Sequence, residues 1–239
     1  AGKFVHQEKC SRRVPPSLLM ASASSREPID AFDPLAVLEE AKAVYNSDAW
    51  EPWEESEGIA IQSMKVEGCS MKATRGDTIF EGLTAQQVSD ALMDRSPDQS
   101  RRKEWDDLYL GGEILEELSD TSKVIYVKFD SGSRLVSNRD MVSVTHSVED
   151  PDGVLWSFGR SVERAEKPNQ KGFVRAVVHL QCFRLENLPE NGGCKVTIIT
   201  HLDPNGMVPA WLANKVSKKQ PMNLLKIRDY AKKCTEAQS

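Results

Sequence analysis

The stretch between residues 111 and 203 constrains the fold most, because it contains six strand-like segments in succession. Each segment is rich in β-branched and aromatic residues, and Gly, Asp, Asn or Pro turns separate them. Strands linked this closely in sequence form antiparallel hairpins, so they predict one large sheet with an apolar face that needs cover. The segments are GGEILEELSD, SKVIYVKFD, RDMVSVTHS, GVLWSFGRS, GFVRAVVHLQCFRL and CKVTIITHL.

The alternation of apolar and polar residues that is typical of a strand is clearest in the fifth of these segments. Arg175, His179 and Gln181 are predicted on the polar face. The opposite face is predicted to carry Val174, Ala176, Val178, Leu180 and Cys182.

Shorter elements precede the predicted sheet region. Asp33 before Pro34 is typical of an N-cap followed by proline at the first helical position. Thr84 and Gln87 form a capping-box pattern. Three further strands are predicted in WEESEGIAIQSMKV and SMKATRGDTIFEGL. The predicted helices cover 34–46, 85–93, and a stretch from Ser96-Pro97-Asp98 through RRKEWDD.

A long C-terminal helix follows the turn Asp203-Pro204-Asn205-Gly206 and is both apolar and cationic. At about 1.5 Å per residue, roughly 25 residues span nearly 40 Å, enough to lie across a sheet. The predicted fold is therefore α+β, a helix-grip fold in which a curved antiparallel nine-stranded sheet wraps around this helix. Pro221 either kinks the helix or separates two helices. The apolar face consists of Trp211, Leu212, Val216, Leu224, Leu225 and Ile227.

Composition excludes several classes of protein. With 39% hydrophobic and 28% charged residues, the chain has the balance of a globular protein. A net charge of −5 argues against nucleic-acid binding, and no apolar run approaches the ~20 residues that span a bilayer. The segment from Met207 onward is basic, however. It predicts either attraction to anionic membrane surfaces or an ordinary solvated helix face.

The cysteine and histidine patterns predict neither disulfides nor cofactors. The five cysteines are scattered without a CxxC pair, so we expect a reducing, cytoplasmic location. No metal site is expected, because the histidines are far apart without metal-ligand spacing. No GxSxG, P-loop or GxGxxG motif is present, and we expect no enzyme. The histidines are His6, His146, His179 and His201.

Five segments in a fixed order resemble the START (steroidogenic acute regulatory protein-related lipid transfer) domain. The resemblance covers about residues 34–233, so we expect a flexible segment at 1–32, a START-like domain at 33–234 and a tail at 235–239. SNRD and the RxxxD spacing at 102–106 resemble the phosphatidylcholine-carrying branch of the family. The segments are RRKEWD (101–106), SNRDMVSV (137–144), GRSVE (159–163), PNQKGFVRA (168–176) and DPNGMVPAWLANKV (203–216).

The resemblance implies that the sheet and the long helix enclose an internal tunnel for one lipid. It implies a monomeric carrier that transfers a glycerophospholipid such as phosphatidylcholine between membranes, touches anionic membranes transiently and does no covalent chemistry. The C-terminal helix and the loop 161–171 would form the gate. A lipid-sensing module of a larger protein and a carrier of sterol or ceramide remain alternatives.

Candidate lipid contacts follow from the same resemblance. Arg102 and Asp106 match head-group contacts of phosphatidylcholine carriers, although an i, i+4 pair can also be a surface ion pair. Met141 and His179 replace walls of a choline cage and weaken attraction for a quaternary amine. The complete set of predicted lipid contacts is Arg102, Asp106, Tyr126, Met141, Ser143, Thr145, His179 and Trp211.

Two of these positions also bear on the sterol alternative. Tyr126 and Thr145 stand where sterol carriers place an acid and an arginine, which argues against a sterol. Arg139, Asp140 and Arg175 match positions that anchor the sheet and its loops. The predicted gate and membrane contacts are Lys167, Pro168, Lys215, Lys218, Lys219 and Pro221.

Overall fold

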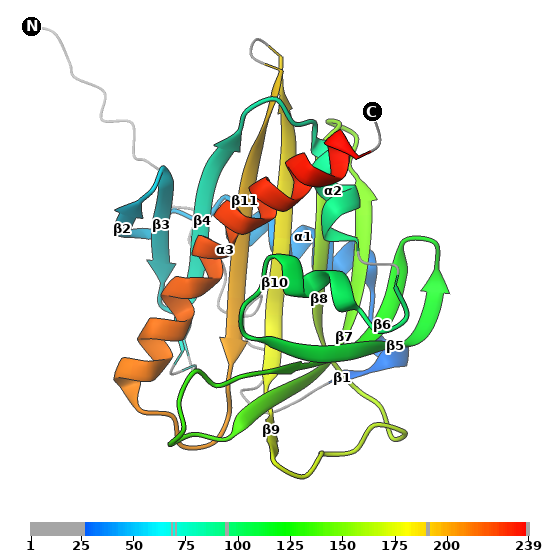
Figure 1. The fold of residues 1–239 in the computed structure, drawn as a ribbon, viewed down its shortest axis with the longest axis vertical. Helices are drawn as coiled ribbons and strands as arrows, with labels where there is room; N and C mark the ends of the chain where they lie inside the picture. Colours follow the sequence, from blue (N-terminus) through cyan, green and yellow to red (C-terminus); the bar gives the residue numbers. More distant parts are fainter. Residues whose placement is uncertain (1–26, 68, 70, 94–95, 190–191, 238–239) are drawn as a thin grey trace, which may run out of the picture.

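The computed structural model describes residues 27–67, 69, 71–93, 96–189 and 192–237. Within these residues, nine strands form one continuous antiparallel path, and the helix-grip prediction is confirmed (Figure 1). Two short strands, β1 (Glu27–Pro28) and β9 (Phe173–Arg175), add in parallel to β8 and β7. The path runs β2 (Glu51–Ser56), β3 (Ile59–Met64), β4 (Ala73–Phe80), β11 (Gly193–Asp203), β10 (Val177–Leu188), β8 (Leu155–Glu163), β7 (Asn138–Glu149), β6 (Ser122–Phe129) and β5 (Tyr109–Ser119).

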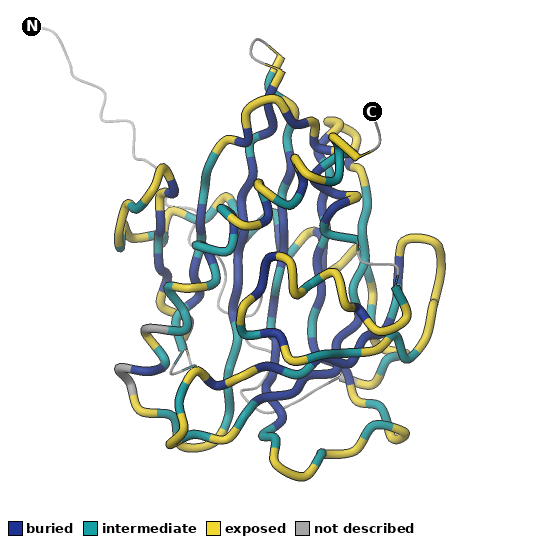
Figure 2. The backbone as a smooth tube through the Cα atoms, in the orientation of Figure 1, coloured by how far each residue is buried: buried dark blue, intermediate teal, exposed yellow. Residues whose placement is uncertain are grey.

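Helices cover both faces of the sheet. In Figure 1, α3 (Ala210–Glu236) crosses in front of β4, β11 and β10, with α2 (Ala85–Leu92) beside it and α1 (Pro34–Tyr45) behind. Figure 2 shows buried residues along the central strands, whereas the hairpin end of β5 is exposed. On the α3 side, the core includes Phe80, Leu83, Val88, Leu185, Val196, Leu224, Ile227 and Ala231.

The two helix caps that the sequence predicts are present in the structure. The Asp33 side chain accepts a hydrogen bond from the Leu35 amide at 2.9 Å and opens α1. Thr84 and Gln87 form the reciprocal capping box that opens α2. Both motifs use only neighbouring residues, so their outcome depends little on the rest of the fold.

The third predicted helix is wrong in type and length. The structure has only a 3-10 helix, η3 (Ser100–Glu104), after Gln99 in a left-handed conformation with φ of 51°. A left-handed residue cannot continue an α-helix, so Ser96 and Asp98 form a turn ahead of the helix instead. The Asp106 amide still donates to the Arg102 carbonyl at 2.9 Å, which keeps their side chains on one side.

The predicted alternation of the fifth segment fails in its second half. A bulge in β10 between Val178 and Leu180 inserts an extra residue opposite β11. A bulge shifts the two-residue period by one. Val178 therefore packs with Met141 on the α3 side, whereas Leu180 and Cys182 pack in the core behind the sheet.

The C-terminal helix is continuous, so the interpretation of Pro221 as a break between two helices is wrong. Pro221 is buried and lies against Gly76 of β4, where a Cβ would come within 2.6 Å of the proline Cβ. Among the helices of the described residues, α3 included, none has the length and apolarity needed to cross a bilayer.

Candidate ligand-binding cavity

Two adjoining cavities lie on the α3 side of the sheet, with volumes of about 400 and 100 Å³. Residues from η3 and strands β5 to β8 line the larger cavity, and α3, β11 and the loop 130–136 line the smaller one. The larger volume lies within the range of about 300–1,000 Å³ that is usual for small-molecule sites. Four residues line both cavities and form the wall that they share: Arg102, Met141, Val178 and Gln181.

Strand β7 supplies a wall in which apolar and polar groups follow one another. Met141, Ser143 and Thr145 all line the larger cavity because alternate residues of a strand share a face. The Ser143 hydroxyl is buried and has no hydrogen-bond partner among the described residues. Thr200 of β11, which lines the smaller cavity, carries a second such hydroxyl. Each unpaired buried hydroxyl costs about 1–3 kcal/mol, so these two atoms are available to a polar ligand group.

Arg102 occupies the junction between the cavities. Its Nε donates to Asp106 Oδ2 at 3.1 Å, and Asp106 is only 2% exposed. The guanidinium lies 5.0 Å from the Trp105 ring centroid and 4.8 Å from that of Phe129. Among the described residues, no hydrogen bond engages its terminal nitrogens. The predicted pair is thus a partly buried, aromatic-framed cation beside a hollow rather than a surface ion pair.

Tyr126 lies away from both cavities. It pairs with Val142 across β6 and β7 and packs with that residue on the opposite face of the sheet. Ile125, one residue earlier, takes the cavity-facing position. The Tyr126 hydroxyl donates to Asp140 Oδ2 at 3.1 Å, and burial with the Asp140 charge raises the Tyr126 pKa. The placement of Tyr126 in the tunnel is therefore wrong by one residue of register.

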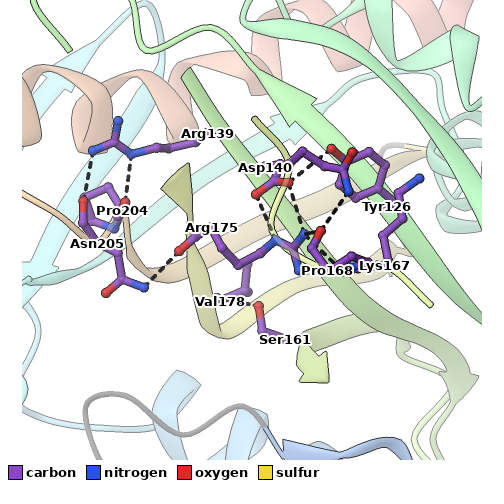
Figure 3. Close-up of polar contacts among 11 residues, drawn as sticks. Tyr126, Arg139, Asp140, Ser161, Lys167, Pro168, Arg175, Val178, Pro204 and Asn205 are labelled. Carbon is purple, nitrogen blue, oxygen red and sulfur yellow. Dashed lines mark hydrogen bonds and ion pairs between the residues drawn. The ribbon is translucent and has the colours of Figure 1, made fainter. Parts of the chain in front are cut away.

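A buried ion pair fixes the loop 164–172. Arg175 Nε donates to Asp140 Oδ1 at 2.8 Å, and both side chains are almost fully buried (Figure 3). Arg175 also donates to the Pro168 carbonyl at 3.1 Å and to the Lys167 carbonyl at 3.2 Å. Lys167 and Pro168 line neither cavity, and these contacts hold them to the sheet.

Arg139 fixes the turn that leads into α3. Its Nε donates to the Pro204 carbonyl at 2.7 Å, and its Nη2 donates to the Asn205 carbonyl at 2.9 Å (Figure 3). Asn205 in turn donates to the Arg175 carbonyl at 2.9 Å. The predicted anchoring role of Arg139, Asp140 and Arg175 is confirmed.

His179 lines neither cavity, and its ring stacks on His201 of β11 with centroids 4.5 Å apart. The interpretation of the histidines as separate residues is wrong for this pair, because β10 and β11 bring them together. Burial lowers the pKa of His179 and favours its neutral form.

Helix α3 closes the smaller cavity. Among the predicted gate residues, Lys218 pairs with Glu54 of β2 at 2.6 Å, and Lys219 is exposed. The side chains of Trp211 and Lys215 lie outside the part of the chain that the structure describes. The α3 residues that line the cavity are Leu212, Ala213, Val216, Ser217 and Gln220.

Comparison with known proteins agrees with this architecture. The family model described as the START domain matches residues 35–235. The chain belongs to the START domain family. Mouse phosphatidylcholine transfer protein is 27% identical over 77% of this START domain chain and 83% of that protein. StAR-related lipid transfer protein 5 of Pongo abelii is 30% identical over 67% of the chain and 75% of that protein.

Among solved structures, human STARD10 superimposes with a TM-score of 0.76 at 20% identity, covering 89% of this chain and 84% of that one. At this identity the likeness establishes the fold alone. Arg102, Met141, Ser143 and Thr145 lie on the cavity wall, as the sequence predicts. The sequence does not predict Gln181 and Thr200 there, because their position depends on the β10 bulge and on the pairing of β11.

Proposed function

We propose that this START domain binds one phospholipid, with its acyl chains in the two cavities and its phosphate at Arg102, and carries it between membranes. The position of Arg102 on the shared wall is the single observation that carries the proposal. A guanidinium framed by aromatic rings and held by Asp106 is oriented before the ligand arrives, and its free terminal nitrogens suit a fork-like contact with phosphate.

A lipid carrier must enclose nearly all of the acyl chains of its ligand. Hiding about 30 methylene groups from water is worth about 0.8 kcal/mol each, or about 24 kcal/mol in total. If much of this apolar surface stayed exposed to water, the lipid would remain in the membrane rather than bind to the carrier. Because these methylene groups occupy more than the combined volume of the two adjoining cavities, α3 would move outward to enlarge the cavities as the chains enter and to release the chains.

The gate follows from what lines the smaller cavity. Val136 of the loop 130–136 and Val208 of the segment before α3 both border it. Two large apolar side chains in the same segments face solvent, Leu135 at 88% and Met207 at 97% exposure. Exposed apolar groups beside a cavity suit insertion into the membrane interface. In this proposal these segments open together with α3, while the loop 164–172 braces the sheet.

The free cysteines support a reducing, cytoplasmic location for such a carrier. Cys69, Cys182, Cys194 and Cys234 form no disulfide in the described part of the chain. Disulfides persist in oxidising compartments and are rare in the cytosol.

Liposome transfer assays on matched arginine variants test the proposal. Arg102→Gln should weaken binding of a fluorescent phosphatidylcholine by about 10- to 150-fold, because hydrogen bonds to a charged group contribute about 1.5–3 kcal/mol. Arg101→Gln is the control, since Arg101 precedes it in η3 and is exposed. Equal affinity of both variants for the phospholipid would contradict the proposed phosphate contact.

A neutral lipid with a hydroxyl group, such as a sterol or ceramide, is the second candidate. The unpartnered hydroxyls of Ser143 and Thr200 favour it, since both offer a hydrogen bond inside the hollow. The same assay separates the candidates. Binding of a neutral lipid should be unaffected by Arg102→Gln and should weaken in the Ser143→Ala and Thr200→Val variants.

A further inference from the structure

Three potential metal ligands converge on the face of the sheet that points away from the cavities. The Sγ of Cys69 and one ring nitrogen each of His179 and His201 all lie within 4.8 Å of one another. Thr200 and Leu202 line the smaller cavity, so His201 between them points to the opposite face.

The β10 bulge creates this convergence. It lies between Val178 and Leu180, and Leu180 is registered with His201. Bulges re-aim side chains, and here the extra residue is His179, whose ring stacks on His201 at an interplanar angle of 28°. Cys69 comes from the loop between β3 and β4, where its amide donates to the Val66 carbonyl at 3.2 Å.

The two histidines are buried without the hydrogen bonds that such rings require. His201 is 2% exposed, and neither of its ring nitrogens has a hydrogen-bond partner of normal geometry among the described residues. The Nε2 of His179 lacks a partner as well. Burying unpaired polar nitrogens destabilises the folded protein. A ligand bound by one nitrogen of each histidine and by the Cys69 sulfur would reduce this cost.

We propose that Cys69, His179 and His201 bind a zinc ion. Two imidazoles and one thiolate are ligands that zinc prefers, at about 2.0–2.1 Å for nitrogen and about 2.3 Å for sulfur. The ligand atoms of such a tetrahedral site lie about 3.3–3.6 Å apart, given these bond lengths, so the three atoms draw together by about 1 Å on binding. The stacked rings of His179 and His201 turn at the same time, so that both nitrogens point at the ion. Zinc takes the sulfur electron pair, the thiol proton leaves to solvent, and water completes the fourth position.

The loop that carries Cys69 borders a surface hollow as well as the smaller cavity. Cys69 lines this hollow of about 480 Å³ together with Lys65, Met71 and Lys72 of the same loop. Met71 and Lys72 also line the smaller cavity on the other side. A bound zinc ion would therefore tie this loop to β10 and β11 and fix one wall of the cavity.

Zinc titration of the reduced full chain tests the proposal directly. After chelator treatment, competition with a chromogenic chelator should reveal one equivalent of bound zinc, and zinc should raise the melting temperature. The cobalt-substituted protein should show a thiolate-to-cobalt charge-transfer band, which requires a cysteine ligand. Because these readouts need no lipid, they stand apart from the lipid-transfer assays.

Matched variants make the result specific. Cys69→Ser should weaken zinc binding at least tenfold and abolish the charge-transfer band. Cys234→Ser is the control, since it removes another half-buried free thiol in α3. His201→Gln, compared with His146→Gln, gives the second test, and Cys69→Ser keeps the proposal testable if His201→Gln does not fold. Absence of stoichiometric zinc, equal loss in Cys234→Ser, or binding of copper(I) without zinc would overturn the proposal.

Discussion

Substituting Gly76 by alanine tests how closely α3 is packed onto the sheet. A Cβ at Gly76 would lie 2.6 Å from Pro221 Cβ and 3.3 Å from Ile198 Cγ2. Carbon atoms prefer separations of about 3.5–4.0 Å, so the helix would have to move outward by about 1 Å. Neither contact is with the mobile end of a long side chain, and the closest one belongs to a proline ring inside a helix.

The expected cost follows from this overlap. Overpacking of a core costs about 1–3 kcal/mol. Gly76 does not have positive φ, so alanine adds no backbone strain there, and its lower entropy in the unfolded chain returns about 0.4–1 kcal/mol. From the central values of these two ranges, the unfolding free energy should fall by about 1.3 kcal/mol. Because α3 covers the smaller cavity, the same displacement should also speed lipid exchange.

Urea denaturation of four proteins measures this effect as a double-mutant cycle: wild type, Gly76→Ala, Pro221→Gly and the double variant. Pro221→Gly removes the nearest atom, so it should recover part of the loss, with a coupling energy above about 0.5 kcal/mol. If Gly76→Ala were as stable as the wild type, or if the two effects simply added, the close contact between β4 and α3 would be refuted.

Two further predictions concern charge. Burial alone would raise the pKa of Asp150. Hydrogen bonds to its carboxylate outweigh burial and lower that pKa; they come from the Val154 amide at 3.1 Å, Lys42 and the Trp156 indole. Its stabilisation is thus present above the ordinary pKa of 3.8 and lost as the pH falls through the lower folded value. Wild type should exceed Asp150→Asn in stability most at neutral pH and converge with it in acid; a constant difference in urea melts would exclude this. Replacing Lys215, Lys218 and Lys219 with Glu should slow transfer from anionic vesicles several-fold, less so at high salt, without unfolding the domain; unchanged rates would remove the membrane role of that face.

What the sequence predicts here depends on how local each signal is. The caps at Asp33 and Thr84 form as predicted because their partners lie within three residues. The third helix is shorter than the sequence predicts, because no residue type marks the left-handed turn at Gln99. Tyr126 was placed on the wrong face because an error of one residue in register reverses a side chain completely.

The cavity and the cysteine–histidine cluster differ in what could be foreseen. The hollow followed from the family resemblance, and no pattern of residues by itself predicts empty space. His179 and His201 are 22 positions apart in the sequence. Only the pairing of β10 with β11, together with the bulge, brings them into contact. The spacing of the two histidines along the chain therefore does not reveal that they meet in the fold.

Native mass spectrometry of the protein purified from cells, followed by identification of whatever it carries, tests the central claim most directly. The account predicts one phospholipid for each chain, lost or exchanged when Arg102 is replaced by Gln. A protein that stays empty when offered phospholipid vesicles, and moves no lipid between them, would contradict the proposed carrier function.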